Sequence, residues 1–572
     1  MPPGTKAILA ALAALGALVT PARFAAGAGA DYRARLAQDE IVYFLLPDRF
    51  ENGDPRNDRG GYSGDRLQTG FDPTAKGFYH GGDLQGLTSR LDYILGLGAT
   101  AIWLGPIFKN KTVQGAPGAE SAGYHGYWIT DFTRVDPHFG TAEDLHALVN
   151  AMHARGMKLY LDIVVNHTAD VIRYRECPDN ACPYRPLTEP PYTPYVPAGE
   201  EHVKAPEWLN DPSYYHNRGN STFEGESSTM GDFSGLDDVM TENPRVVQGF
   251  IDIYGAWIDQ YHIDGFRIDT AKHVNPEFWQ AFVPAMLARA QANGIPNFHI
   301  FGEVASSELN VPLLALHTRV DKLPAVLDFG FFAAVRDTVA GSAGTEELAR
   351  LFAADELYAG GAPTALQLPT FISNHDAGRF ALFVERLRPQ ASGTEVLQRA
   401  RLAQAMLLTL RGVPVIYYGD EQGFVGHGED QASRQDMFPS QVASYNDQPL
   451  LGTKATTATS SFNPDHPLYR FIAGLARLRR AEPALRRGAQ LVRASGPTPG
   501  LFAASRFDPG TGRELLLAFN TSTAPVSAVV PVESSSRHFK TLQGHCAATV
   551  TAPGSYRVKL QPLEFMVCGA GP

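Results

Sequence analysis

Eight short apolar segments recur along the chain, and helical patterns separate them. Each segment is rich in β-branched and aromatic residues, as in "KLYLDIVVNH" from Lys158. The intervening "AEDLHALVNAMHARG" places Leu145, Leu148, Val149 and Met152 on one helical face. Strands that alternate with helices form parallel sheets, and eight such units close into a barrel. The sequence therefore predicts an α/β fold, a (β/α)8 TIM barrel. Its strands are expected within residues 40–50, 99–108, 158–167, 264–270, 298–304, 325–331, 369–376 and 413–421.

Two regions depart from this alternation. About seventy residues rich in Pro, Tyr, Asn and Gly follow the third strand, which is too long for a simple loop and predicts an irregular inserted subdomain. After a last helix near "RFIAGLARLRR", short alternating runs predict a C-terminal β-sandwich. The expected organisation is barrel at 31–167, insert (subdomain B) at 168–240, barrel again at 241–485 and β-sandwich at 486–572.

The first thirty residues have the pattern of a secretory signal peptide. Lys6 precedes the apolar run "AILAALAALGALV", and small residues continue to Ala30. The run is too short for an ordinary membrane span. Residues 1–30 are therefore expected to be removed, leaving a secreted or periplasmic protein with no membrane attachment; an uncleaved anchor is the alternative.

Four cysteines agree with export. An even number in an exported protein suggests two disulfide bonds, and four cysteines allow three pairings. Proximity along the chain favours Cys177–Cys182 and Cys546–Cys568.

Polar residues end several predicted strands, where the active sites of such barrels lie. Asp162, Asn166 and His167 end the third strand, Arg267 and Asp269 the fourth, Glu303 the fifth, and His375 and Asp376 the seventh. Gathering carboxylates costs repulsion and desolvation, so a purely structural role explains them poorly. Glycoside hydrolysis uses two carboxyl groups, one as nucleophile and one as acid/base. Arg267 lies on the same strand face as Asp269 and is expected to hold the pKa of Asp269 down, whereas Glu303 would need a raised pKa.

The segments "DIVVNHT", "GFRIDTAKH", "GEV" and "FISNHD" resemble the four signature segments of the α-amylase superfamily of retaining α-glucan enzymes. The resemblance extends to "GYHGYWITDF" and "GVPVIYYGDEQG". It implies that Asp269 is the nucleophile, Glu303 the acid/base and Asp376 the transition-state stabiliser. The substrate-binding residues that it implies are Tyr127, His167, Arg267, Lys272, His273, His375, Asp430 and Arg434. Lys272 and His273 would bind glucose units on the leaving-group side; a solvated turn is the alternative.

Two further segments, "ENGDPRND" and "GGD", offer the oxygen ligands that Ca²⁺ prefers. Similar segments form a calcium site in cyclodextrin glucanotransferases and neopullulanase-like enzymes. The ligands implied here are Asn52, Asp54, Asn57, Asp58, Asp83 and the Gly81 carbonyl. A turn rich in Asn and Asp is the alternative. Many α-amylases hold a second calcium through an Asn that matches Asn166 and an Asp of the insert; that Asp falls at Gly235, and Asp232 or Asp237 would have to replace it.

The sequence thus predicts an exported glycoside hydrolase that cleaves α-1,4-glucans with retention. A cyclomaltodextrinase, maltogenic amylase or glucanotransferase is the alternative within enzymes, although "GEVASS" lacks the Trp that often follows the acid in cyclomaltodextrinase-like enzymes. A non-catalytic glucan-binding relative is the alternative from another class. The net charge of −11 without a basic stripe argues against a nucleic-acid partner, and no oligomeric state is predicted.

Overall fold

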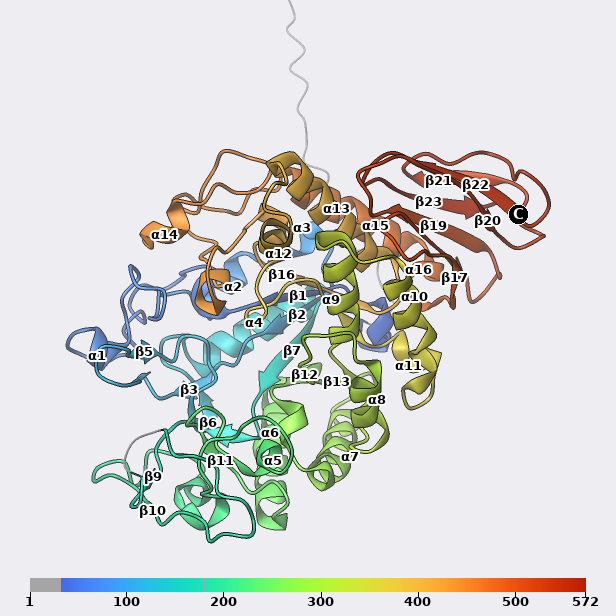
Figure 1. Cartoon of the computed structure of the whole chain (residues 1–572). Coiled ribbons are helices and arrows are strands. Elements are labelled where there is room, and N and C mark those ends of the chain that lie inside the picture. Colours follow the sequence, from blue (N-terminus) through green and yellow to red (C-terminus); the bar gives the residue numbers. More distant parts are fainter. Residues whose placement is uncertain (1–31, 178–180, 572) are drawn as a thin grey trace, which may run out of the picture.

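The computed structural model describes residues 32–177 and 181–571 (Figure 1). The predicted signal peptide lies outside these residues. All eight predicted strands are present and form one parallel sheet in the order β14-β13-β12-β7-β2-β1-β16-β15. They are β1 (Val42–Leu45), β2 (Ala101–Leu104), β7 (Lys158–Ile163), β12 (Gly265–Ile268), β13 (His299–Gly302), β14 (Ala325–Val326), β15 (Pro369–Thr370) and β16 (Val413–Tyr417). The predicted barrel is confirmed.

The two edge strands of this sheet, β14 and β15, meet and nearly close the barrel. The backbone N–H of Asp328, just after β14, donates to the carbonyl of Pro369 at 2.8 Å. Every residue of β1, β2, β7, β12, β13 and β16 is buried, because side chains fill the barrel interior and helices cover its outside.

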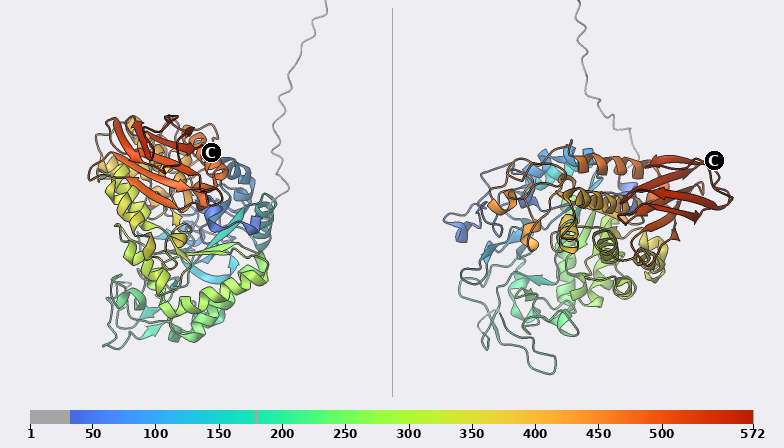
Figure 2. Two further views of the ribbon diagram at one scale, coloured as in Figure 1. Left: turned by 90° about the vertical axis from the view of Figure 1, so that its right-hand side faces the viewer. Right: turned by 45° about the horizontal axis from the view of Figure 1, so that its top comes forward.

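The helices surround the sheet (Figure 2). The amphipathic pattern near residue 145 forms α4 (Ala142–Ala154), whose N-cap Thr141 accepts from Asp144 N, and the four predicted apolar residues are buried. The other helices of six or more residues are α2 (Leu84–Ser89), α3 (Leu91–Leu97), α6 (Pro244–Tyr261), α7 (Pro276–Ala292), α8 (Val311–Arg319), α9 (Phe329–Val335), α10 (Glu346–Ala353), α12 (Phe380–Leu387), α13 (Gly393–Thr409) and α15 (Pro467–Ala481). Among the described residues, none of the helices is long and apolar enough to cross a membrane.

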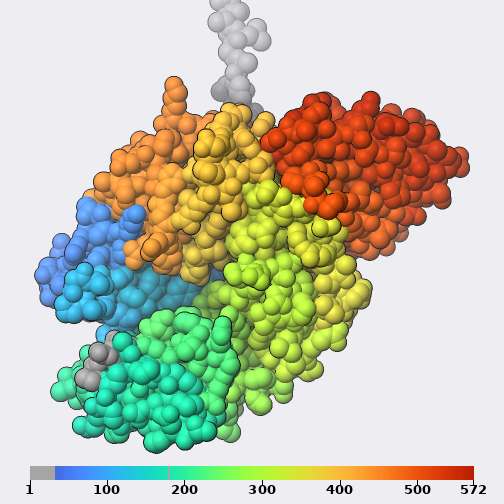
Figure 3. Space-filling model, in the orientation of Figure 1, coloured from blue at the N-terminus to red at the C-terminus, as the bar shows by residue number. Residues whose placement is uncertain are grey.

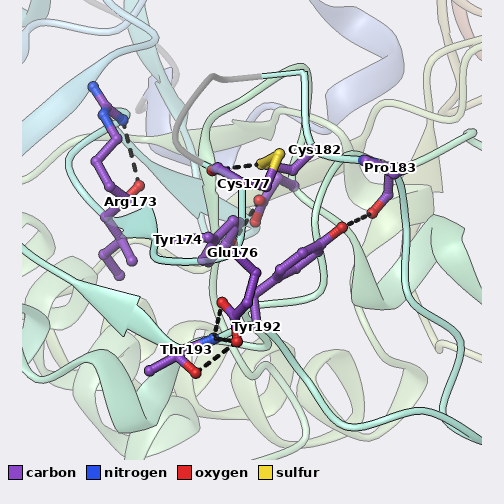
Figure 4. The surroundings of a disulfide bond; sticks show 10 residues. Arg173, Tyr174, Glu176, Cys177, Cys182, Pro183, Tyr192 and Thr193 are labelled. Atoms are coloured by element: carbon purple, nitrogen blue, oxygen red, sulfur yellow. Dashed lines mark hydrogen bonds between the residues drawn. A yellow bond between two sulfur atoms is a disulfide. The ribbon is translucent and has the colours of Figure 1, made fainter.

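The insert between β7 and α6 has little regular structure, as its composition predicts. Its short elements are β8 (His167–Thr168), β9 (Arg173–Tyr174), β10 (Pro194–Tyr195), α5 (Ser227–Met230) and β11 (Asp237–Asp238). Strand β11 pairs antiparallel with β8, which returns the chain to the end of β7. A disulfide joins Cys177 to Cys182, and nearby Tyr192 donates to the carbonyl of Pro183 at 2.9 Å (Figure 4).

The C-terminal region forms two antiparallel sheets on the side of the molecule away from the insert (Figures 1 and 3). The larger has the order β17-β18-β19-β23-β21 and the smaller pairs β20 with β22. Their bounds are β17 (Gln490–Ala494), β18 (Leu501–Phe507), β19 (Glu514–Asn520), β20 (Val526–Pro531), β21 (Phe539–Gln543), β22 (Ser555–Leu560) and β23 (Phe565–Ala570). Leu516 and Met566 of one sheet share a buried cluster with Val530 and Val558 of the other. The second predicted disulfide, Cys546–Cys568, lies here.

Candidate active site

A cavity of about 820 Å³ opens at the carboxyl ends of the barrel strands. The three predicted catalytic carboxylates, those of Asp269, Glu303 and Asp376, all line it. Five of the predicted substrate-binding residues line it too: Tyr127, His167, His375, Asp430 and Arg434. The other three, Arg267, Lys272 and His273, lie beneath or beside the cavity rather than in its lining.

The pairing of β12 with its neighbouring strands fixes the positions of Asp269 and Glu303. Asp269 directly follows β12, and its N–H donates to the carbonyl of Ile163, at the end of β7. Glu303 follows β13, and its N–H donates to the carbonyl of Ile268. These bonds extend the parallel ladder by one residue, so both side chains emerge at the same edge of the barrel on adjacent strands.

Arg267 contacts both of these carboxylates and that of Asp162 as well. Its Nη1 donates to Asp162 Oδ1 and to Asp269 Oδ1, each at 2.8 Å, and its Nη2 forms an ion pair with Glu303 Oε1 at 2.9 Å. Arg267 and Asp162 are register partners on β12 and β7, which explains their contact. Arg267 is expected from the sequence to pair with Asp269, and the structure makes it a shared partner of three acids.

The expected low pKa of Asp269 is wrong in its net direction. Burial raises the pKa of Asp269 well above its usual value, and although Arg267 opposes this, the nearby Glu303, Asp162 and Asp376 carboxylates add to the rise. Burial likewise raises the pKa of Asp162 to about 6, against the effect of Arg267. One guanidinium cannot offset the desolvation of several carboxylates that share it.

Glu303 has a second fixed contact besides Arg267. Its Oε2 accepts from the backbone N–H of Thr270 at 3.1 Å. Thr270 has φ +49°, a left-handed conformation that is unfavourable for a β-branched residue. Such strain is concentrated at functional sites, and here it directs a backbone donor at the carboxylate.

Asp376 lies in a second polar group of the cavity lining. Arg434 Nη2 lies 3.2 Å from Asp376 Oδ1 and 2.8 Å from Asp430 Oδ2, while its Nε donates to the carbonyl of His375. His375 Nε2 lies 3.2 Å from Asp376 Oδ2. Half of the Asp376 side chain stays exposed to the cavity, so it is held in place yet accessible to a ligand.

Aromatic rings form the remaining wall of the cavity. Tyr127 stacks on His375 with ring centroids 5.4 Å apart, and its hydroxyl donates to Asp162. His167 stacks on Phe233 of the insert, and its Nε2 is buried without a hydrogen-bond partner among the described residues. Burial lowers the pKa of His167 to about 3, so the ring is neutral and its free nitrogen can bond a hydroxyl group.

Several lining residues were missed by the sequence analysis. His125 lies within the quoted "GYHGYW" and accepts from Tyr127 N at 3.1 Å, so its motif was a usable signal. Phe233 comes from the insert, and Phe332 and Phe383 come from helices outside any recognised segment. Phe329 lies in the expected sixth strand, residues 325–331, but belongs to α9. Their sequence positions carried no periodic or motif signal that distinguishes them from ordinary core residues.

Lys272 and His273 lie on the Glu303 side of the site. Lys272 Nζ donates to the carbonyl of Ala305, just beyond Glu303, at 3.1 Å. His273 Nδ1 lies 2.9 Å from the carbonyl of Ser228 in the insert, and its ring packs edge-on against Phe233. These contacts join the strand end to the insert.

The predicted calcium loop has unmet acceptors. Asn52 Oδ1 and Asn57 Oδ1 are buried and accept no hydrogen bond from any residue that the structure describes. Gly81 has φ +99°, and a Cβ there would lie 2.7 Å from Asp58 Oδ1. Burial, reinforced by the carboxylates of Asp83, Asp48 and Asp54, raises the pKa of Asp58 to about 6. Crowded acids beside unused amide oxygens fit a hard cation.

Two carboxylates of the predicted ligand set have protein partners outside the set. Asp54 forms an ion pair with Arg56, and Asp83 caps α2 by accepting from Gly86 N at 2.7 Å. Within residues 32–177 and 181–571 no cluster of three or more His, Cys, Asp or Glu side chains is arranged to hold a metal ion, so calcium here would depend on Asn and carbonyl oxygens.

The two acids that the resemblance suggests for a second calcium, Asp232 and Asp237, both have protein partners. Lys204 Nζ donates to Asp237 Oδ2 at 2.6 Å, and both side chains are buried. Asp232 instead accepts from the hydroxyl of Tyr174 at 2.7 Å. Both substitute acids that the sequence suggested therefore have partners within the insert.

The site thus lies at the mouth of a parallel barrel, with two carboxylates from adjacent strands, a third in the same cavity and aromatic rings beside them. This is the arrangement of a carbohydrate-cleaving barrel enzyme. The comparisons agree: the family model "Alpha amylase, catalytic domain" matches residues 44–488. The chain belongs to the α-amylase family.

Individual relatives include both α-amylases and a cyclomaltodextrin glucanotransferase. An α-amylase of Streptomyces lividans is 45% identical over 535 residues, which are 87% of this chain and 58% of that protein. The chain thus spans less than two thirds of that relative. The crystal structure of an Anoxybacillus α-amylase superposes with a TM-score of 0.71 at 28% identity, covering 94% of this chain and 99% of the other. The cyclomaltodextrin glucanotransferase CldA, which has a three-domain ABC distribution, superposes with a TM-score of 0.72 at 26% identity, covering 93% and 99%.

Proposed function

We propose that this protein is an exported α-amylase that hydrolyses α-1,4-glucosidic bonds of starch or maltodextrin-type glucans with retention of configuration. The observation that carries the proposal is the pair Asp269 and Glu303, which come from adjacent strands, line one cavity and share the guanidinium of Arg267. Family membership supplies the substrate class.

The first step breaks the glycosidic bond. The Glu303 carboxyl donates its proton to the glycosidic oxygen as the Asp269 carboxylate attacks the anomeric carbon from the opposite side. The electron pair of the broken bond stays with the leaving sugar, which departs as an alcohol, and a β-linked glycosyl–Asp269 ester remains. Arg267 contacts both carboxyl groups, so it offsets the negative charge that passes from Asp269 to Glu303 as the ester forms.

The second step returns the enzyme to its starting state. Glu303, now ionised, removes a proton from water, and the water oxygen attacks the anomeric carbon and displaces Asp269 as a carboxylate. Two inversions give a product with the α configuration. Asp376, beside His375 and Arg434, would bond ring hydroxyls and favour distortion of the sugar.

For the other substrate contacts we propose the following. Tyr127 stacks on the sugar at the cleavage point, and the free Nε2 of His167 bonds its hydroxyl groups. Asp430 and Arg434 bind the next sugar outward. Lys272 and His273, on the Glu303 side, bind glucose units beyond the scissile bond.

Calcium is part of the proposal. Asn52, Asp54, Asn57, Asp58, Asp83 and the Gly81 carbonyl would hold Ca²⁺, and the unmet oxygens of Asn52 and Asn57 support this set. When bound, the ion neutralises the crowded acids of the N-terminal loop and thereby stabilises the barrel mouth. Export is proposed from the signal-like N-terminus and from both disulfides, which persist in oxidising compartments.

The decisive experiment compares Glu303→Gln with wild type on soluble starch. The variant should lose at least about a thousandfold in turnover, because glutamine cannot donate or accept the proton. It should still bind maltooligosaccharides, since the rest of the cavity is unchanged. Full activity in the variant would overturn the roles given to Asp269 and Glu303, and an inactive wild type that binds glucan would favour a non-catalytic glucan-binding protein.

A glucanotransferase is the second candidate, favoured by the similarity to CldA over nearly its whole length. Both reactions share the glycosyl–Asp269 ester and differ only in whether water or a sugar hydroxyl attacks it. Chromatography of the products from starch, cyclodextrin and pullulan separates them: linear short glucans favour hydrolysis, and cyclic products favour transfer.

A further inference from the structure

A second cavity, of about 230 Å³, lies at the opposite end of the barrel from the candidate active site. It is lined by Ile41, Thr100 and Met157, each of which directly precedes a barrel strand (β1, β2 and β7). The ends of α15 and of α16 (Pro483–Arg487) close it. This position excludes any contact with a glucan bound at the carboxyl ends of the strands.

Arginine dominates the lining of this cavity. Its basic lining residues are Arg35, Arg155, Arg479, Arg480 and Arg486, and Asp39 is the single acidic one. Such a concentration is unexpected in a chain whose net charge is −11. Like charges repel at close range, so the cluster needs compensation.

The buried carboxylates near the cavity already form ion pairs with two cationic side chains each. Asp39 pairs with both Arg486 and Arg487, and Glu40 pairs with both Arg35 and Lys158. Asp92, paired with Arg155, is mostly exposed. Cations therefore outnumber carboxylates around this space.

Arg479 has the least compensation. Its side chain is fully buried, and its guanidinium donates to four backbone carbonyls, those of Gln38, Leu408, Gly412 and Leu485. No carboxylate of the described residues pairs with it, and its Nε has no hydrogen-bond partner among them. Burial, together with Arg486, lowers the pKa of Arg479 to about 9.

Arg480 and Arg486 provide further free donors. Arg480 donates only to the carbonyl of Gly98, at 3.3 Å, and forms no ion pair within the part of the chain that the structure describes. Arg486 Nε is buried and has no partner there either. Of these three arginines, only Arg479 is a fully buried charge without a carboxylate partner in the described part of the chain, which is a strongly destabilising arrangement, whereas Arg480 is exposed. Guanidinium N–H groups are good donors to oxyanions.

We propose that this cavity binds a tetrahedral oxyanion of the sulfate or phosphate class, held between Arg479, Arg480 and Arg486 with Arg35 and Arg155 at its rim. A water molecule occupies about 30 Å³, so the space admits such an anion with several waters. The anion would link the α15–α16 turn to the amino-terminal ends of the barrel strands. The inference is independent of the glucan-cleaving function.

The test measures sulfate binding by titration calorimetry at constant ionic strength, with chloride as the balancing salt. Sulfate is the probe because phosphate would precipitate calcium. Wild type should bind one sulfate per chain, and Arg480→Gln and Arg155→Gln should each weaken binding at least tenfold. The matched control is Arg477→Gln, which removes the same charge from an exposed residue of α15 that does not line the cavity.

The melting temperature gives a second readout. Sulfate stabilises many proteins by exclusion from their surfaces, an effect that does not saturate. Binding at this site should instead give a saturable rise in melting temperature in wild type and Arg477→Gln that is lost in Arg480→Gln. Absence of sulfate binding to wild type, or equal loss in the Arg477→Gln control, would overturn the proposal.

Discussion

Arg267 connects the carboxylates of the candidate site. It contacts carboxylates from three consecutive strands of the barrel, β7, β12 and β13. The spacing of Arg267 and Asp269 predicts that they share a strand face, because side chains two residues apart on a strand point the same way. Its contacts with Asp162 and Glu303 depend on the register between strands, which no local pattern encodes. The net pKa of Asp269 was mispredicted for the same reason, since burial is a property of the assembled barrel.

The first prediction concerns Asp269. Asp269→Asn should lower kcat on starch by several orders of magnitude while leaving maltooligosaccharide binding largely intact, because only the covalent step is lost. Turnover and ligand binding should be measured on the same preparation. If the variant keeps more than about a hundredth of the wild-type rate, another residue is the nucleophile.

A second prediction at this scale uses the direction of the pKa of Asp269. The nucleophile must be ionised, and Arg267 is the group that lowers its pKa against burial. In Arg267→Lys the charge remains but one ammonium cannot reach all three carboxylates, so the pKa of Asp269 should rise further. The acidic limb of the kcat/KM profile should therefore move to higher pH, together with a lower maximum. An unshifted acidic limb would show that Arg267 does not control this ionisation.

At the scale of the elements, the sixth strand shows a limit of predicting strands from apolar runs. The segment 325–331 is uniformly apolar apart from Asp328, and it was expected to be one strand. The structure ends β14 at Val326, because Asp328 caps α9 by accepting from Phe331 N at 2.8 Å. Residues 329–331 therefore belong to a helix, and Phe329 reaches the active-site cavity. Apolar runs alone do not distinguish a buried strand from a buried helix start.

The N-terminal calcium loop gives a prediction with a defined pH dependence. The pKa of Asp58 in the metal-free fold is raised to about 6, against about 3.9 in an unfolded chain. Without calcium, this carboxyl favours folding at low pH, and that contribution is lost as pH rises through about 6. Calcium needs the ionised form, so below pH about 6 it must displace a proton and its affinity should fall by up to about tenfold per pH unit.

The measurement is the rise in melting temperature on adding calcium to chelator-treated protein. The rise should be larger at pH 7 than at pH 5, and Asp58→Asn or Asp54→Ala should abolish it. Asp465→Asn, at an exposed residue just before α15 and outside the predicted ligand set, is the control and should respond like wild type. A calcium response that is identical in Asp58→Asn would show that the loop is an ordinary Asn- and Asp-rich turn.

The C-terminal sheets offer a prediction about the second disulfide. Cys546 and Cys568 are separated by 22 positions, and closing a loop of this length stabilises a fold by about 3 kcal/mol in the chain-entropy model. Replacing both cysteines by serine should lower the denaturant midpoint of this region while starch hydrolysis at low temperature persists, since the sheets lie away from the cavity. Unfolding followed by circular dichroism, with the Cys177–Cys182 pair retained, checks this; an unchanged midpoint would contradict it.

At the scale of the whole molecule, the barrel brings together residues that are distant in sequence. Tyr127, Asp269, Glu303 and Asp376 come from four separate segments and line one cavity. Their convergence was predictable, because the carboxyl ends of parallel strands meet at one mouth. The path of the insert was not predictable, because its short elements show no hydrophobic periodicity. Phe233, which stacks on His167, was found only from the folded chain.

The same convergence predicts the stereochemistry of the proposed reaction. Asp269 and Glu303 follow adjacent strands, and neighbouring strands lie about 4.8 Å apart. Their carboxylates also share one guanidinium. This closeness fits the roughly 5–5.5 Å separation of retaining enzymes better than the roughly 6.5–9.5 Å of inverting ones, which must also hold a water molecule between the carboxyl group and the sugar.

Hydrolysis of an α-linked maltooligosaccharide should therefore release the α anomer first. NMR of the anomeric protons during the first minutes, before mutarotation, distinguishes the outcomes. Glu303→Gln under the same conditions supplies the baseline, since mutarotation of any contaminating sugar continues without the enzyme's reaction. If the β anomer appears first, water attacks the substrate directly, no glycosyl–Asp269 ester forms, and the roles proposed for both carboxylates are wrong.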